Sequence, residues 1–227
     1  MSQENPAILF NENTLMWFRQ TMLAWGKNHL KVFPWRQTTD PYAIFVAEFL
    51  LQQTDAPRVL PVYQVLLQRY PTLSDLAASS VLDLADILKP LGFHFRAERL
   101  HQAALLLVSD PNYGGTIPND ETQLLSFSGV GKYTARAVCA QAFDHATAVL
   151  DTNVARIMQR FFGLQPHRKR VRNDPFFWEA AQSIAPDTNV GLWNLTLIDF
   201  GSAVCTSRNP RCDSCPLRER CLYYRAL

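Results

Sequence analysis

Four of the five cysteines lie in one stretch near the C-terminus, CTSRNPRCDSCPLRERC, with the spacing Cys205-x6-Cys212-x2-Cys215-x5-Cys221. Four thiolates in so short a loop suit either a tetrahedral zinc ion or a [4Fe–4S] cluster. Zinc sites usually contain two C-x-x-C pairs, and only Cys212 and Cys215 form one here. The spacing therefore favours the iron–sulfur cluster, which would close a loop that has no core of its own.

The sequence shows neither a secretory signal nor a membrane span. The N-terminal MSQENPAILFNENT has no basic region followed by an apolar stretch. No apolar run approaches the roughly 18 residues that a membrane helix needs. We therefore expect a cytoplasmic protein without a membrane partner, in which clustered cysteines bind metal rather than form disulfides. The fifth cysteine, Cys139, lies in the apolar stretch ARAVCAQAF and is expected in the core.

Helical periodicity runs through almost the whole chain. We expect Asn13 to cap a helix over TLMWFRQTMLAWGKNHL, and Asp40-Pro41 to begin a helix over PYAIFVAEFLLQQT, with proline at its first position. Further helical patterns cover about 57–69, 81–88, 94–109, 120–126, 132–143, 153–162, 174–184 and 189–203. Because no alternating strand pattern accompanies them, the sequence predicts an all-α protein of roughly ten helices.

The basic residues are unevenly distributed. The formal net charge is only +2, which says little about partners. The run HRKRVR at 167–172 is strongly basic, and five arginines follow in the tail: Arg208, Arg211, Arg218, Arg220 and Arg225. Taken alone, such runs are typical of a solvated face.

A glycine pair interrupts the helical pattern in LLSFSGVGKYTARAVCAQAF, residues 124–143. Gly129 and Gly131 permit a tight turn that a Cβ atom would hinder. The backbone N–H groups of this turn and of the following helix form an anion site that a phosphate can approach closely. An ordinary helix–helix turn would give the same short pattern.

Two carboxylates lie in surroundings that suit catalysis. Glu48 sits in the apolar helix IFVAEFLLQQT, where it is either paired in the core or has a raised pKa as a proton donor. Asp151 follows an apolar segment and precedes a helix in AVLDTNVARI. There it either caps the helix or is a carboxylate held at a helix start, facing a site.

These features, in this order, resemble the helix-hairpin-helix DNA glycosylases of the endonuclease III superfamily. The resemblance extends from about Phe33 to Cys221 and rests on FPWRQTTDPYAIFVAEFLLQQT, GVGKYTARAV, LDTNVARI and the cysteine spacing. It implies a two-lobed, endonuclease III-like fold with double-stranded DNA between the lobes. Residues 38–148 would form a six-helix barrel with the hairpin, and residues 1–37 plus 149–227 the iron–sulfur lobe.

The resemblance also implies how DNA is gripped and where the protein works. Gly129, Gly131 and Lys132 would bind a phosphate, and the cluster loop would press Arg208 and Arg211 against the backbone. The substrate would be DNA containing a mismatch or lesion. We expect a monomer, because nothing in the sequence suggests a homodimer. We also expect the protein to be associated with the nucleoid.

The catalytic residues follow from the same resemblance. Glu48 would protonate or hydrogen-bond the departing base, and Asp151 would stabilise the positive charge that develops on the sugar. Tyr133 and Asn153 would position the base, the sugar or Asp151. Bifunctional family members carry a nucleophilic lysine where this chain has Tyr133. Lys132 lies one residue earlier, about 100° around the helix, so the resemblance implies hydrolysis of the glycosidic bond without strand cleavage.

The sequence leaves the target base open between two related groups. Gln52 and Gln53 would probe the gap left in the duplex, while Trp35, Arg36 and Asp199 match positions of the MutY adenine glycosylases. Phe93 departs from their usual tyrosine pair. Because the sequence stops six residues after its last cysteine, we expect the further domain of those enzymes to be absent. GVGKYT, QRFFG and CLYY resemble the thymine–guanine mismatch glycosylases.

We therefore expect thymine or uracil opposite guanine to be removed. Adenine opposite guanine or oxidised guanine is the alternative. A second alternative is a catalytically idle DNA-binding protein of the same fold.

Overall fold

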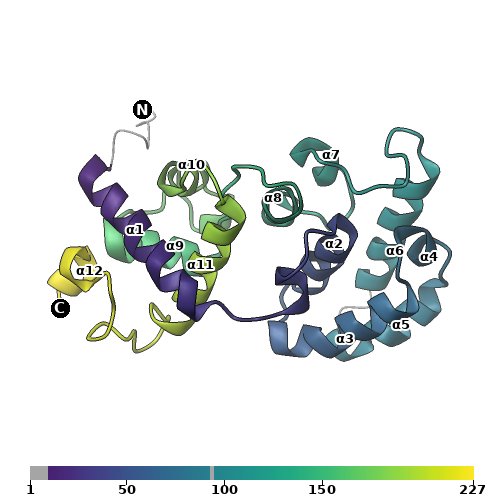
Figure 1. The fold of residues 1–227 in the computed structure, drawn as a ribbon, viewed down its shortest axis with the longest axis horizontal. Helices are drawn as coiled ribbons and strands as arrows, with labels where there is room; N and C mark the ends of the chain where they lie inside the picture. The colour runs from purple at the N-terminus through teal and green to yellow at the C-terminus, as the bar shows by residue number, and fades with distance from the viewer. Residues whose placement is uncertain (1–9, 93–94) are drawn as a thin grey trace. The chain divides into compact units, whose positions relative to one another are not determined.

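The computed structural model describes residues 10–92 and 95–227. Within these ranges it contains twelve α-helices, four short 3-10 turns and no strand, which confirms the all-α prediction (Figure 1). None of these helices is both long enough and apolar enough to cross a bilayer. Chain contacts divide the protein into a middle unit, Val32–Phe143, and a terminal unit, Met1–Lys31 with Asp144–Leu227. The expected boundaries at 37/38 and 148/149 lie a few residues further along the chain.

The middle unit is a bundle of short helices around one apolar core. Its longer members are α2 (Pro41–Leu50), α3 (Ala56–Arg69), α6 (Phe95–Ser109) and α8 (Lys132–Ala142). The shorter ones are α4 (Leu73–Ala77), α5 (Val81–Leu88) and α7 (Glu121–Leu125), with 3-10 turns at Pro34–Arg36 and Lys89–Leu91. Helix α2 is buried along almost its whole length, and it packs against α3, α6 and α8.

The terminal unit joins the two ends of the chain. It contains α1 (Glu12–His29), α9 (Thr152–Phe162), α10 (Pro175–Ile184), α11 (Val190–Ala203) and α12 (Leu222–Arg225), with 3-10 turns at Val171–Asn173 and Arg218–Arg220. Helix α11 packs against α1 and α9, and α12 packs against α9. The segment between α11 and α12 is largely irregular and contains the four clustered cysteines.

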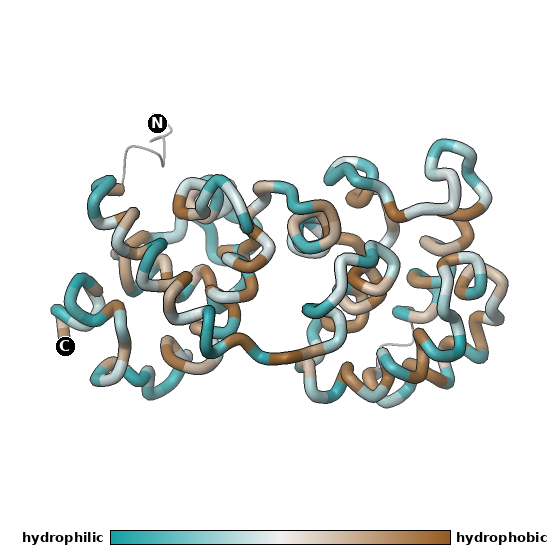
Figure 2. Tube along the Cα trace, viewed as in Figure 1, coloured by the Kyte–Doolittle hydropathy of each residue, from teal (hydrophilic) through white to brown (hydrophobic). Residues whose placement is uncertain are grey.

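Local sequence signals explain most of these helices. Asp40 caps α2 by accepting hydrogen bonds from the N–H groups of Tyr42 and Ala43, and Pro41 is the first helical residue, as predicted. Apolar and polar residues alternate along α3 and α5 (Figure 2), as expected for helices with one buried face. Cys139 is fully buried in α8, which confirms its expected place in the core.

The structure corrects the sequence prediction at several helix ends. Asn11 rather than Asn13 caps α1, because its side chain reaches the N–H of Thr14 at 3.2 Å. Helix α2 ends at Leu50, so that Gln52 and Gln53 lie in a turn and not on the helix. The five-residue helix α4 was not predicted. Its start is marked by a capping box in which Thr72 and Asp75 each bind the other's backbone N–H.

Candidate functional site

Glu48 lies inside the core of the middle unit and is only 5% exposed. Burial raises the pKa of its carboxyl group to about 7, because the charged form loses its hydration. The side-chain amide of Gln141 on α8 donates a hydrogen bond to Oε1 at 3.1 Å, and the charge of Arg36 also favours the anion. The other oxygen, Oε2, is buried without a hydrogen-bond partner in the described part of the chain. Glu48 can therefore hold a proton at neutral pH.

Trp35 and Arg36, which precede α2, have different surroundings. Trp35 is 2% exposed and stacks on Phe33, with the ring centroids 4.8 Å apart. The ring of Tyr63 meets it edge to face. The guanidinium of Arg36 lies 5.5 Å from the centre of the Phe33 ring. Trp35 thus belongs to the core of the middle unit, whereas Arg36 is close enough to influence Glu48.

The glycine-rich turn between α7 and α8 has the hairpin form that the sequence predicted. Gly129 has φ +89, and a Cβ atom there would lie 3.0 Å from Arg99 Cδ and 3.2 Å from Phe49 Cζ. Gly131 differs, because its φ is −97 and a Cβ atom would meet nothing within 4 Å. Only Gly129 is therefore required by the turn itself, which corrects the expectation for the pair. Gly131 instead leaves open space at the start of α8.

The start of α8 offers backbone donors to an incoming anion. Gly131 is the N-cap and provides no side-chain cap, and Lys132 is exposed beside it. The first N–H groups of a helix have no partner within that helix, and the helix dipole adds positive potential there. Tyr133 is half-buried in the first turn of α8.

The turn after α2 is tied to this hairpin. The Gln52 side chain donates a hydrogen bond to the carbonyl oxygen of Gly129 at 2.9 Å. Arg96, which is 3% exposed, donates to the carbonyl oxygens of Leu50 at 2.8 Å and Gln52 at 2.7 Å. Gln53 is exposed and has φ +56, a conformation that is strained for a residue other than glycine. These hydrogen bonds from Gln52 and Arg96 fix the turn, and Gln53 is exposed to solvent.

Asp151 is the N-cap of α9 in the terminal unit. Its Oδ1 accepts the N–H of Val154 at 2.7 Å, and its Oδ2 accepts the side-chain amide of Asn153 at 2.7 Å. Burial raises the pKa of this carboxyl group, while the two hydrogen bonds and the charge of Arg156 oppose that rise. The structure therefore confirms that Asp151 caps α9, which was one of the two interpretations of its place in the sequence. In this role both carboxylate oxygens accept hydrogen bonds, which favour the ionised form of Asp151.

The segment leading to Asp151 is fixed by two amide side chains instead of a neighbouring strand. Asn194 accepts the N–H of Val149 at 3.1 Å and donates to the carbonyl oxygen of Thr147 at 3.0 Å. Gln182 binds the backbone of Ala146 and Ala148 in the same manner. Buried backbone groups need such partners, so these amides set the position of the start of α9.

Helix α9 also connects Asp151 to the cysteine loop. Arg156 donates to Asn153 Oδ1 at 2.7 Å and to the carbonyl oxygen of Cys205 at 2.6 Å. One turn further, Arg160 lies 3.5 Å from Cys205 Sγ and donates to the carbonyl oxygen of Thr206 at 2.7 Å. A continuous chain of hydrogen bonds therefore runs from the Asp151 carboxylate, through Asn153 and Arg156, to the backbone of Cys205.

Gly201 on α11 allows this arrangement to form. A Cβ atom at Gly201 would lie 2.5 Å from Asn153 Cβ and 3.1 Å from its Cα. The carbonyl oxygen of Gly201 accepts a hydrogen bond from Arg156 at 2.7 Å. Any larger residue at Gly201 would push the start of α9 away from α11.

The four cysteines line one pocket, together with residues that include Arg160, Arg211 and Arg218. No group of described His, Cys, Asp or Glu side chains is placed to share a single metal ion, whereas a [4Fe–4S] cluster takes one thiolate at each iron. Burial and the neighbouring thiols raise the pKa values of Cys212 and of Cys215, the latter to about 11. Four thiolates at this site therefore need a cationic partner, and the donor set fits the cluster.

The remaining candidates fall into three groups. Phe93 lies outside the described residues. Asp199 is buried on α11, and its Oδ2 accepts the N–H of Lys31 at 2.8 Å. Arg208 and Arg211 are exposed on the cysteine loop, as is most of the basic run 167–172.

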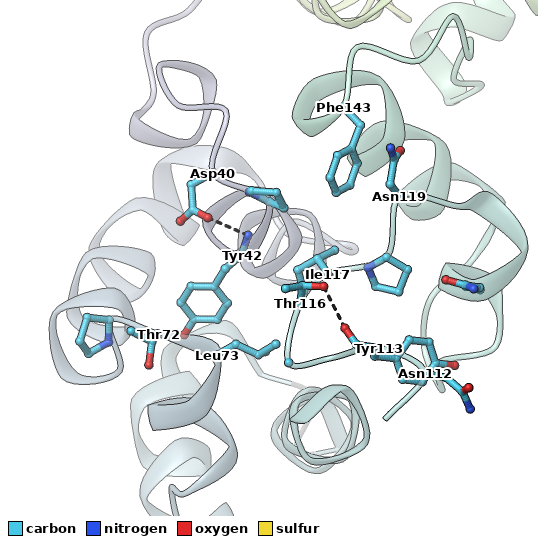
Figure 3. Close-up of a pocket in the computed structure, with 15 residues that line it drawn as sticks. Asp40, Tyr42, Thr72, Leu73, Asn112, Tyr113, Thr116, Ile117, Asn119 and Phe143 are labelled. Carbon is cyan, nitrogen blue, oxygen red and sulfur yellow. Dashed lines mark hydrogen bonds between the residues drawn. The ribbon is translucent and has the colours of Figure 1, made fainter. Parts of the chain in front are cut away.

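A pocket of about 700 Å³ in the middle unit contains none of these candidates. In Figure 3 its wall includes Tyr42, Tyr113 and Phe143, and the carboxylate of Asp40 is already engaged in capping α2. The pocket therefore does not coincide with the candidate site.

Comparison with protein families decides the relationship. The model of the HhH-GPD superfamily of base excision DNA repair proteins matches residues 46–178. The iron–sulfur binding domain of endonuclease III matches residues 205–221. The chain belongs to the HhH-GPD superfamily. It is accordingly a DNA glycosylase with a C-terminal [4Fe–4S] cluster, as the sequence predicted.

Several curated members of the superfamily are similar over most of the chain. Thymine-DNA glycosylase of Aeropyrum pernix is 37% identical over 91% of this chain and 93% of its own length. Thymine/uracil-DNA glycosylase of Methanothermobacter thermautotrophicus is 34% identical over the same shares. Adenine DNA glycosylase of Mycolicibacterium smegmatis is 35% identical, but the match covers 86% of this chain and 66% of that longer protein.

A solved structure agrees with this grouping. The structure of a thermostable thymine-DNA glycosylase matches with a TM-score of 0.88 at 32% identity, covering 95% of this chain and 98% of that one. The fold of this HhH-GPD member is therefore the endonuclease III-like fold that its sequence predicted.

Sequence reasoning located the carboxylates, the hairpin and the cysteines but missed the residues that hold them. Those residues are Gln141, Arg96, Arg156, Arg160, Asn194, Gln182 and Gly201. Polar residues inside apolar helices were the available signal, as with Gln141 in ARAVCAQAF and Asn194 in VGLWNLTLI.

Proposed function

We propose that the protein is a monofunctional DNA glycosylase that removes thymine or uracil opposite guanine from double-stranded DNA. The observation that carries the proposal is the buried Glu48, whose pKa of about 7 leaves it partly protonated at neutral pH. Such a group suits general acid catalysis, since efficiency is greatest when the pKa lies near the working pH. The target nucleotide must leave the base stack before its glycosidic bond can be reached.

Glu48 is the acid of the proposed reaction. It donates a proton or a hydrogen bond to the base as the N-glycosidic bond breaks, and the bonding electrons leave with the base. Gln141 restrains Oε1 at 3.1 Å, so that Oε2, which lacks a hydrogen-bond partner in the described part of the chain, is the atom available for the base. A water molecule adds to the sugar carbon, and its proton is taken up by a carboxylate or by solvent.

Asp151 stabilises the positive charge that develops on the sugar. The N–H of Val154, the amide of Asn153 and the charge of Arg156 all favour its ionised form. Two carboxylates with different environments then perform different tasks, as in other glycoside hydrolyses. Tyr133 occupies the position from which a lysine would attack the sugar, and its phenol cannot form the imine that leads to strand cleavage.

The proposed DNA contacts are to phosphates. Backbone N–H groups at the start of α8, beside Gly131, and the side chain of Lys132 bind one phosphate, and Gln53 enters the gap left by the extruded nucleotide. When bound, the cluster closes the cysteine loop. Arg160 binds the carbonyl oxygens of this loop and thereby supports the exposed Arg208 and Arg211.

The choice of base rests on the similarity to thymine and thymine/uracil glycosylases, which match this chain over 93% of their own lengths. Removal of adenine is the competing activity, because adenine glycosylases are also relatives. The proposed substrate is a mismatched duplex, the proposed active form is a monomer, and the proposed location is the nucleoid. Sedimentation with and without a duplex would test the monomer.

The decisive experiment is a single-turnover assay on duplexes carrying T:G, U:G, A:G or adenine opposite oxidised guanine, each with and without alkali. The expected result is strand breakage only after alkali, and only for T:G and U:G. Release of adenine would make the protein an adenine glycosylase. Strand breaks without alkali would contradict the role given to Tyr133.

An Asp151→Asn variant separates base release from DNA binding. It should bind the same duplexes and release no base. Undiminished release by this variant would exclude Asp151 from the reaction. A wild-type protein that binds tightly but releases no base from any duplex would instead be a passive DNA binder.

A further inference from the structure

Arg99 on α6 lies against the hairpin, although no sequence motif marks it. A Cβ atom at Gly129 would lie 3.0 Å from Arg99 Cδ and 3.7 Å from Arg99 Cβ. The aliphatic stem of the arginine therefore packs directly on the backbone of the hairpin turn. Because Gly129 has φ +89 and no side chain, this close approach depends on glycine at that position.

The guanidinium of Arg99 stacks on an aromatic ring. It lies 4.5 Å above the centre of the Phe95 ring, one helical turn earlier on α6. Among the described residues no carboxylate forms an ion pair with Arg99, whereas Arg69 and Arg136 each have one. Stacking occupies the face of a guanidinium and leaves the N–H donors along its edge available to an oxygen anion.

The surroundings of Arg99 are accessible to a large ligand. Phe95 is 45% exposed, and Arg99 itself is partly exposed. A large aromatic ring and an unpaired arginine, both open to solvent and next to backbone donors, are typical of nucleic-acid surfaces.

We propose that Arg99 is a further DNA-binding residue that contacts a backbone phosphate beside the phosphate bound by the hairpin. Phe95 acts as the platform that keeps the guanidinium in place before DNA arrives. A phosphate is the favoured ligand because planar guanidinium groups bind phosphate oxygens with two parallel hydrogen bonds. The inference rests on the proposed function only in that DNA is the ligand, and it does not depend on which base is removed.

The test is the salt dependence of DNA affinity, measured by fluorescence anisotropy with the cluster-containing protein. The probes are a fully matched duplex and one with guanine opposite a tetrahydrofuran abasic analogue, neither of which can release a base. Each phosphate contact contributes about 0.9 to the slope of log K against log [salt]. Arg99→Met keeps the aliphatic stem on Gly129 and removes the charge.

Arg99→Met should reduce the slope by about 0.9 on both duplexes and weaken binding roughly eightfold at about 0.1 M salt. Arg99→Lys should retain the wild-type slope, because the charge remains. Arg69→Met is the matched control, since Arg69 is an exposed arginine of the same unit whose partner is Asp83. It should change neither slope nor affinity.

An unchanged slope for Arg99→Met would overturn the proposal. A loss of affinity that appears only on the duplex with unpaired guanine, at constant slope, would also overturn it and would indicate contact with a base. Base release by the wild type is measured separately. The proposed base specificity can thus be wrong while the role of Arg99 is confirmed. The role of Arg99 can likewise be wrong while the base specificity is confirmed.

Discussion

Glu48→Gln should make the protein more stable at alkaline pH while abolishing base release. The pKa of Glu48 is raised from 4.5 to about 7 by burial. The folded protein therefore holds a proton that the unfolded chain has lost between these two values. The associated stability is fully present below pH 4.5 and is lost as the pH rises through 7. Over the whole window the loss amounts to about 3 kcal/mol.

The variant lacks this titration, so the difference between the two proteins should depend on pH. Between pH 5 and pH 8 the wild type should lose about 2–3 kcal/mol relative to Glu48→Gln. For a chain of this length that corresponds to roughly 5–10 °C in Tm. Any constant effect of the amide on packing cancels, because only the change with pH is compared.

Paired thermal unfolding of the cluster-containing proteins at fixed scan rate, from pH 5 to pH 9, measures the difference. Glu98→Gln is the control, since Glu98 is an exposed glutamate on α6, and its Tm should follow the wild type throughout. In parallel, the single-turnover rate of the wild type should fall as the pH rises above 7. A Tm difference between Glu48→Gln and wild type that stays constant over this range would refute the buried, raised-pKa carboxyl group.

Four further variants test contacts at the hairpin, at α9 and at the cysteine loop. Gly129→Ala should destabilise the protein by about 1–3 kcal/mol, because φ +89 and the contacts at 3.0 and 3.2 Å leave no room for Cβ. Gly131→Ala should leave Tm unchanged yet weaken DNA binding in an anisotropy titration, and equal effects on Tm would contradict this distinction. Arg156→Met should lower the single-turnover rate with DNA affinity retained, since Asn153 loses the donor that orients it; an unchanged rate would show that this hydrogen bond is dispensable. Cys215→Ser should reduce iron content and DNA affinity together, and normal affinity without iron would separate the cluster from the DNA contacts.

The sequence predicted the helices well because their signals are local. A cap such as Asp40 and its proline neighbour act within one turn, and the buried face of α3 repeats within 14 residues. The errors are also local. Asn11 and Asn13 are equivalent cap types two residues apart, and the structure selects the one whose side chain reaches Thr14.

The residues that hold the site could not be found in this way, because their contacts are distant in sequence. Gln141 reaches Glu48 across 93 residues, and Asn194 reaches Val149 across 45. For Gly131 the sequence suggested a requirement that the structure does not show. Its pairing with Gly129 suggested a steric need, whereas its own surroundings are open.

The two carboxylates show why composition alone does not assign acid and anion. Both Glu48 and Asp151 have pKa values raised by burial, so burial does not distinguish them. Their hydrogen bonds do. Glu48 accepts one amide, and its Oε2 has no hydrogen-bond partner among the described residues. Asp151 accepts a backbone N–H on one oxygen and an amide on the other, with Arg156 nearby.

Hydrogen bonds and positive charge favour the ionised form of a carboxyl group. These contacts therefore oppose the effect of burial more strongly at Asp151 than at Glu48. This difference fits the roles proposed for them, in which Glu48 would supply a proton to the departing base and Asp151 would stabilise the sugar as an anion.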